Sequence, residues 1–193
     1  MASCSGAVPG AGISTIVAGD GDATFPQAQP LVLDLGCGNG VFLAGLAAAR
    51  PEWNVLGIEK KDYRVRQARR RTADSHNARV VHGEVSEVLA ALPEHSVSRV
   101  YLLFSDPWPK RRHAVRRLVQ AEFAHLVGSR LQPDGVFFFA SDSAEYAEWA
   151  EEIFRSSVWK VSLWDLPVDW PATEFEQRFV SSGVQIRRFQ ATR

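Results

Sequence analysis

The sequence predicts an α/β fold in which helices cover both faces of a doubly wound, mostly parallel β-sheet. Two observations predict it. From Leu31 onward, short apolar runs of strand length alternate with longer runs of helical period. The chemically distinctive residues also fall at turns that directly follow successive apolar runs. Ligands of open parallel sheets bind beyond the carboxyl ends of the strands, so these turns are expected to line one cleft.

Each expected element has its own local signal. The expected strands are short, mostly apolar runs at 31–35, 54–58, 79–82, 98–104 and 136–140, with two more near 158–163 and 184–189. The expected helices are the longer amphipathic runs at 39–50, 61–73, 116–131 and 144–154, with a short one ending at residue 92. Pro51 ends the first helix, and the Gln-Pro-Asp-Gly turn at 132–135 precedes the fifth strand.

Length and composition fit a single soluble domain. The chain has 193 residues, and 46% of them are hydrophobic, which is enough for a substantial core. Residues 1–29 are rich in Gly, Ala and Ser without a sustained period, so they are expected to form a mobile tail before a domain at 30–193. The two cysteines, Cys4 and Cys37, show no metal-ligand spacing. The sequence contains no apolar run of the about 20 residues that a membrane span needs, so we expect a cytoplasmic protein with no membrane partner. We also expect no metal partner.

The charges are balanced overall but clustered locally. There are 22 Lys and Arg residues against 22 Asp and Glu. Seven cations lie between Lys60 and Arg71, and five more lie between Lys110 and Arg117. Such local clusters can steer a polyanion even when the net charge is zero. The alternative is that both clusters are ordinary solvated helix faces.

A glycine-rich turn follows the first expected strand. It reads Asp34-Leu35-Gly36-Cys37-Gly38-Asn39-Gly40 and opens the first expected helix. The glycines allow a sharp turn and a close ligand approach. The dinucleotide fingerprint needs its third glycine at position 41, where Val41 stands, which disfavours a nicotinamide dehydrogenase. An acid before the loop suits a cationic ligand, and this indicates S-adenosylmethionine.

Acids also follow the second and third expected strands. Glu59 lies about 20 residues past the glycine loop, where a carboxylate can accept hydrogen bonds from both ribose hydroxyls. Glu84 could accept from an adenine amino group, although an acid at the start of an ordinary helix is the competing interpretation.

The fourth expected strand runs into the segment Phe104-Ser105-Asp106-Pro107-Trp108-Pro109-Lys110, followed by further cations. Two prolines stiffen this turn at the mouth of the expected cleft. The Asp106 carboxylate could accept from N1–H and the 2-amino group of guanine. Trp108 could stack on a base or pack internally, and the cations could hold phosphates.

With this segment in place, the sequence resembles the tRNA (guanine-N7-)-methyltransferase family. The matching pieces run in family order: 34–40, 57–59, 106–113 with Arg116 and Arg117, 119–120, 122–123, 141–142, Tyr146, 173–176 and Arg178. The Asp-Pro-Trp-Pro-Lys and Thr-x-Phe-Glu segments are specific to that family. Trp170 stands where family members usually carry Arg.

The resemblance implies a class I, Rossmann-like methyltransferase fold and methylation of guanosine N7 in the tRNA variable loop. It implies that Asp106 is the active-site acid. The implied contacts to S-adenosylmethionine are Asp34, Gly36, Gly38, Gly40, Glu59, Glu84 and Asp106. The implied substrate contacts are Lys110, Asp142, Thr173, Glu174, Phe175 and Glu176. The arginines expected to follow the RNA backbone are Arg66, Arg69, Arg70, Arg112 and Arg116.

Two rival functions remain open at this point. Ser105-Asp106-Pro107-Trp108 loosely matches the motif of enzymes that methylate exocyclic amino groups, which must lose a proton during transfer. The other rival is a cofactor-binding fold that serves as a non-catalytic RNA-binding subunit. Guanine N7 carries a lone pair and no proton, so its methylation needs positioning and electrostatics rather than a general base. The sequence does not fix the oligomeric state.

Overall fold

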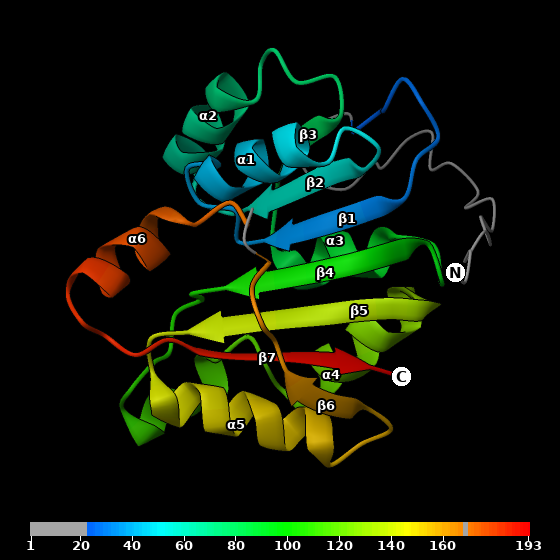
Figure 1. The fold of residues 1–193 in the computed structure, drawn as a ribbon. Helices are drawn as coiled ribbons and strands as arrows, with labels where there is room; N and C mark the ends of the chain where they lie inside the picture. Colours follow the sequence, from blue (N-terminus) through cyan, green and yellow to red (C-terminus); the bar gives the residue numbers. More distant parts are fainter. Residues whose placement is uncertain (1–22, 168–169) are drawn as a thin grey trace, which may run out of the picture.

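A seven-stranded β-sheet forms the centre of the molecule (Figure 1). The computed structural model describes residues 23–167 and 170–193. The strands lie in the order β3-β2-β1-β4-β5-β7-β6, and β7 runs antiparallel to both of its neighbours. Their bounds are β1 Leu31–Leu35, β2 Asn54–Glu59, β3 Ala78–His82, β4 Val97–Leu103, β5 Leu131–Ser141, β6 Lys160–Leu163 and β7 Arg187–Thr192. The doubly wound, mostly parallel sheet predicted from the sequence is confirmed.

Six α-helices and one 3₁₀ helix accompany the described strands. Their bounds are α1 Val41–Ala49, α2 Asp62–Arg71, α3 Val85–Ala91, η1 Arg111–Arg116, α4 Ala121–Arg130, α5 Ala144–Arg155 and α6 Glu174–Ser181. Helices α1 and α2 pack on one face, where Phe42 and Val65 join Val32 and Tyr101 of the sheet. Helices α3, α4 and α5 pack on the other face with Leu33. Side chains alternate across a pleated sheet, so neighbouring strand residues serve different cores.

Most expected elements are present, with differences at their ends. The expected helix 116–131 begins only at Ala121, because Arg117 and Gln120 both have extended backbone and the Arg117 side chain is fixed to a neighbouring loop. Strand β5 begins at Leu131, so residues 132–135, which were expected to form a turn, lie inside the strand. They make its pairing with β4 irregular, because the register shifts between Val97 and Arg99. The expected last strand, 184–189, lies at 187–192. Helix α6 was not predicted.

The segment before β1 contributes to the core where it is described. Residues 1–22 of the expected mobile tail lie outside the described residues. Ala23 and Phe25 are buried, and the Asn54 side chain donates to the Gln27 carbonyl oxygen at 2.8 Å. Among the described helices, none is long and apolar enough to cross a membrane.

Candidate active site

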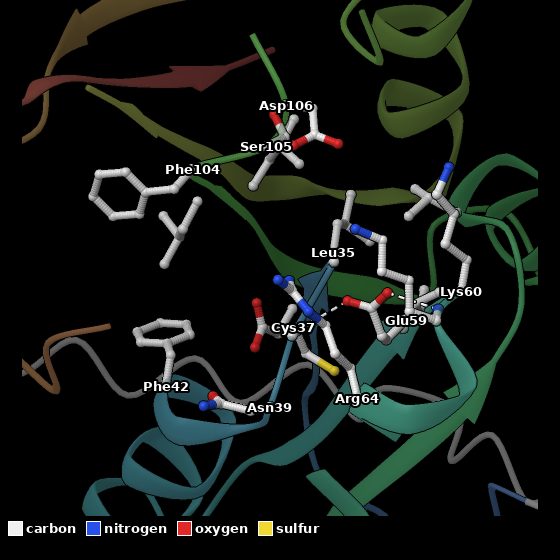
Figure 2. Close-up of a pocket in the computed structure, with 18 of the residues that line it drawn as sticks. Leu35, Cys37, Asn39, Phe42, Glu59, Lys60, Arg64, Phe104, Ser105 and Asp106 are labelled. Atoms are coloured by element: carbon white, nitrogen blue, oxygen red, sulfur yellow. Dashed lines mark hydrogen bonds between the residues drawn. The ribbon is translucent and has the colours of Figure 1, made fainter. Parts of the chain in front are cut away.

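A pocket of about 930 Å³ opens at the carboxyl ends of the central strands. It lies where the strand order reverses, between β1 and β4, which is the usual binding position in a doubly wound sheet. The turns after β1, β2, β3 and β4 all line it, together with parts of α2 and α6. Figure 2 shows Cys37, Asn39 and Glu59 on one side, with Ser105 and Asp106 across from them. The sequence-based expectation of one cleft built from four turns is met.

The glycine loop is tied to the end of β2. The backbone N–H groups of Gly36 and Cys37 both donate to the Ile58 carbonyl oxygen, at 2.8 and 3.0 Å. Gly36, Gly38 and Gly40 all have positive φ angles, which L-residues with a side chain rarely adopt. A Cβ on Gly40 would lie 2.8 Å from the backbone Cα of Ala68, so this glycine also allows α1 and α2 to approach closely.

Asp34 is a buried carboxylate at the floor of the pocket. Its side-chain Oδ2 is buried and has no hydrogen-bond partner among the described residues. Burial, and then the charge of Glu59, raises the pKa of Asp34 from 3.8 to about 7. A cation placed here would satisfy the oxygen and favour the ionised form.

Glu59 is held in one orientation by the backbone. Its Oε2 accepts from Gly38 N–H at 3.1 Å, and its Oε1 accepts from Lys61 N–H at 2.8 Å. The residue is only 6% exposed and lines the pocket. A carboxylate has about four acceptor sites, so two remain for a ligand with paired hydroxyl groups.

Arg64 is a pocket residue that the sequence pattern did not distinguish from its neighbours. It reaches from α2 into the cavity, where its Nη1 lies 3.6 Å from an ideal Cβ on Gly38 (Figure 2). Burial opposes its charge, but the Tyr63 hydroxyl and the charges of Glu59 and Asp106 hold the pKa of Arg64 above its ordinary value. Its place within a run of cations gave no sign that it differs from its neighbours.

The loop after β4 forms the far wall of the pocket. Phe104, Ser105, Asp106 and Trp108 all line it. Phe104 and Trp108 have φ angles of 55° and 44°, so two bulky residues occupy the left-handed region. The Asp106 side chain is solvent-exposed at the pocket. The Arg116 guanidinium lies 5.0 Å from the ring centroid of Trp108, and the His113 ring meets Trp108 edge-on. Trp108 is therefore packed as well as facing the pocket.

Helix α6 covers the pocket from the C-terminal part of the chain. Thr173, Glu174 and Phe175 line the cavity. The Thr173 hydroxyl caps the helix by accepting from Glu176 N–H at 2.9 Å. Asn39 of the glycine loop donates to Glu174 at 2.5 Å, which joins α6 to the opposite wall.

Three expected substrate residues do not line the pocket. Glu176 is buried and forms an ion pair with Arg188 of β7, which fastens α6 to the sheet. Lys110 precedes η1 and is exposed, and Asp142 follows β5. Their contacts with substrate stay predictions. Glu84 does line the pocket, and it pairs with Lys60 at 3.5 Å.

The expected RNA-contacting arginines differ in what they already contact. Arg66 pairs with Asp62 one helical turn away, and Arg69 donates to the Val80 carbonyl oxygen. Arg70 and Arg112 are exposed. Arg116, which lies over Trp108, also lines the pocket. Arg116 alone of these five therefore stands at the pocket in the described structure.

Trp170 closes one side of the second core. Its ring lies 5.2 Å from the rings of Phe42, Tyr101 and Trp164, measured between centroids. Pro171 beside it contacts α1, where a Cβ on Gly45 would come within 2.7 Å of it. Trp170 thus packs the segment before α6 against the sheet. This aromatic packing is its visible role at the position where the resembled family usually carries Arg.

Comparisons with known proteins agree on family and fold. A family model described as "Putative methyltransferase" matches residues 28–189. The tRNA (guanine-N(7)-)-methyltransferase of Halorhodospira halophila is 36% identical over 176 residues, covering 86% of this chain and 76% of the relative. That of Leuconostoc mesenteroides is 32% identical over 192 residues, covering 92% and 88%.

Solved structures resemble the fold at much lower identity. A precorrin-6y C5,15-methyltransferase from Geobacter metallireducens superposes with a TM-score of 0.62 at 14% identity, covering 84% of this chain and 78% of that one. A SAM-dependent methyltransferase from Aquifex aeolicus gives a TM-score of 0.57 at 15% identity, covering 84% and 80%. At these identities the likeness shows the class I, Rossmann-like fold.

Proposed function

The chain belongs to the tRNA (guanine-N(7)-)-methyltransferase family, and we propose that it transfers a methyl group from S-adenosylmethionine to N7 of a guanosine in the variable loop of tRNA. The observation that carries the proposal is the pocket itself. It brings Asp34 and Glu59 to one end and Asp106 to the other, within one cavity at the switch point of the sheet.

The donor set at the glycine loop fits S-adenosylmethionine. Asp34 offers a buried, unpartnered carboxylate oxygen to the cationic amino group of the methionine part. Glu59 offers acceptor sites to the two ribose hydroxyls. Glu84 stands at the pocket for the adenine amino group. When bound, the cofactor supplies an electrophilic methyl group on a positively charged sulfur.

Asp106 is the residue proposed to recognise the target base. Its carboxylate accepts from N1–H and from the 2-amino group of guanine, which fixes the ring and keeps electron density on it. N7 has a lone pair and no proton, so no side chain has to remove a proton from it. The chain's contribution to the rate is therefore the position and the electrostatic environment of the base.

The target guanosine enters the pocket from a loop rather than from a duplex. In A-form RNA the deep, narrow major groove keeps N7 out of reach of a side-chain pocket. A nucleotide swung out of its stack can enter the cavity, as in other base-modifying enzymes. Phe175, which is 37% exposed and lines the pocket, offers an apolar surface to the incoming base. The exposed arginines Arg70 and Arg112 are proposed to hold the surrounding phosphates.

Mass spectrometry tests this function. The protein is incubated with unmodified tRNA and methyl-labelled S-adenosylmethionine, and the digested nucleosides are separated and fragmented. We expect labelled 7-methylguanosine, lost when the variable-loop guanosine is replaced by adenosine. A label on an exocyclic amino group would establish the amino-group rival, and tRNA binding without any label would establish the non-catalytic rival.

A further inference from the structure

A buried arginine lies directly behind the loop that carries Asp106. Arg117 follows η1, and only 3% of its side chain is exposed. Its Nε donates to the carbonyl oxygen of Pro107, the residue after Asp106, at 2.9 Å. Burying a charged group costs free energy, which hydrogen bonds and an opposite charge from its partners must offset. The proposed chemistry does not use this residue.

Among the described residues, the other partners of the Arg117 guanidinium belong to α5. Its Nη2 donates to Glu145 at 2.7 Å. Its guanidinium carbon lies 5.5 Å from the ring centroid of Tyr146 and 5.3 Å from that of Trp149. Trp149 is itself anchored, since its indole N–H donates to the Val119 carbonyl oxygen at 2.9 Å. The guanidinium is thus fixed relative to one rigid helix by three neighbours.

Both sides of Asp106 are tied to this part of α5. On the N-terminal side, the Ser105 hydroxyl donates to the Tyr146 hydroxyl at 3.3 Å. On the C-terminal side, Pro107 is held by Arg117. The left-handed backbone at Phe104 and Trp108 is strained and persists only where the surroundings fix it.

We propose that Arg117 is the positioning residue for recognition of the target base. It fixes the backbone next to Asp106 against α5, so that the carboxylate is already in place when the base arrives. The proposal rests on the proposed function, because it takes Asp106 as the group that contacts guanine. A displacement of about 1 Å at a reacting site can cost about 100-fold in rate, so losing this anchor should lower kcat. The cofactor contacts proposed for Asp34, Glu59 and Glu84 lie on other loops and should be unaffected.

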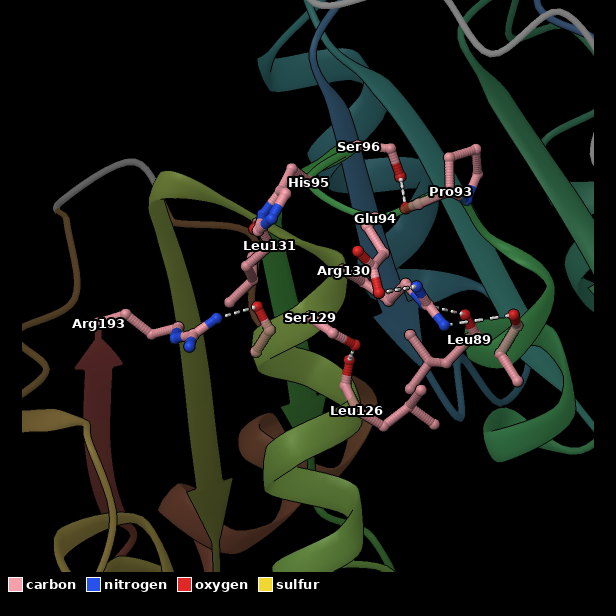
Figure 3. A network of polar contacts seen from close by, with 12 residues as sticks. Leu89, Pro93, Glu94, His95, Ser96, Leu126, Ser129, Arg130, Leu131 and Arg193 are labelled. Carbon is pink, nitrogen blue, oxygen red and sulfur yellow. Dashed lines mark hydrogen bonds and ion pairs between the residues drawn. The ribbon is translucent and has the colours of Figure 1, made fainter.

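Arg130 provides a matched control at the other end of the sheet. It is also mostly buried, with 15% of its side chain exposed, and pairs with Glu94 at 3.7 Å. Its Nε donates to a backbone carbonyl oxygen, that of Leu89, at 2.9 Å (Figure 3). It ends α4 just before β5, away from the carboxyl ends of the strands. Its replacement should lower stability without touching the loop of Asp106.

The test compares Arg117→Lys with Arg130→Lys. Lysine keeps the charge but lacks the planar fork that bonds two oxygens while stacking on rings. We expect Arg117→Lys to lower kcat about 10- to 100-fold, with the Kd of S-adenosylmethionine within about twofold of wild type. Arg130→Lys should lower Tm and leave kcat near wild type. Equal kcat values for the two variants would overturn the proposal.

Two further variants keep the test decisive. If Arg117→Lys cannot be purified, Glu145→Ala replaces it, since the Glu145 side chain is 61% exposed. A several-fold fall in kcat at wild-type Tm supports the proposal, and an unchanged kcat overturns it.

In the Asp106→Asn background, Arg117→Lys should cause little further loss of kcat, because both substitutions act on one contact. Full multiplication of the two losses would overturn the inference alone, whereas full activity of Asp106→Asn would overturn the proposed role of Asp106 as well.

Discussion

The affinity for S-adenosylmethionine should depend on pH through Asp34. Burial and the neighbouring Glu59 raise the pKa of Asp34 to about 7 in the free protein. The amino cation of the cofactor favours the ionised carboxylate, so binding shifts this pKa down again. Below pH 7, binding must first remove the proton, and the affinity falls toward tenfold per pH unit. Because the pKa of Asp34 is raised in the free protein, S-adenosylmethionine should bind most tightly above that pKa and more weakly below it.

The expected size follows from the protonated fraction. With a pKa of about 7 in the free protein, the Kd should rise about 15-fold between pH 7.0 and pH 5.5. At pH 6.5, binding should release about three quarters of a proton. The α-amino group of the ligand stays mostly charged in this window, because its pKa is about 7.7–8.0.

Isothermal titration calorimetry in buffers of different ionisation enthalpy measures both quantities. Asp34→Asn carries a neutral amide at the same position, so it should bind more weakly at pH 7.0 and with little dependence on pH. A wild-type Kd that is constant from pH 7.0 to 5.5, with no proton released, would refute the placement of a cation at Asp34.

Three further changes test other parts of the structure. Gly40→Ala should destabilise the fold by at least about 2 kcal/mol in thermal or urea unfolding, since φ is 79° and the new Cβ would lie 2.8 Å from Ala68 Cα; an unchanged Tm would contradict this. Thr173→Ala should cost about 1 kcal/mol through loss of the α6 cap, with Thr173→Ser near wild type; equal stability of both variants would argue against the cap. Reversing Arg70 and Arg112 to Glu should weaken tRNA binding and lower its salt slope by about one per lost phosphate contact, with cofactor affinity unchanged. An unchanged slope would make both arginines ordinary solvated cations.

The fold and the place of the glycine loop and Glu59 at the pocket were predictable because their signals are local. A buried parallel strand is a short apolar run, and the spacing of Asp34, Gly36, Gly38 and Gly40 is visible within seven residues. Glu59 was found by its position at the end of the next strand. These features depend on the chain's own order along one sheet, so alternation and turn residues are sufficient to place them.

The features that were missed depend on contacts between distant segments. Helix α6 was missed although Thr173, three residues before Glu176, is a capping signal that could have indicated it. Arg64 and Arg117 lie in runs of cations whose other members are mostly exposed. What sets them apart comes from distant segments: the charges of Glu59 and Asp106 act on Arg64, and the rings of α5 pack against Arg117.

The reading of guanine by Asp106 is tested most directly by removing one hydrogen-bond donor from the base. The measurement is the single-turnover methylation rate of tRNA carrying guanosine or inosine at the target position, since inosine lacks only the 2-amino group. We predict that the wild type methylates guanosine about 5- to 150-fold faster, since an acceptor that the bound base covers and leaves unpaired costs about 1–3 kcal/mol. Asp106→Asn should be slower on guanosine and discriminate less between the two bases. Equal wild-type rates on guanosine and inosine would contradict the proposed contact.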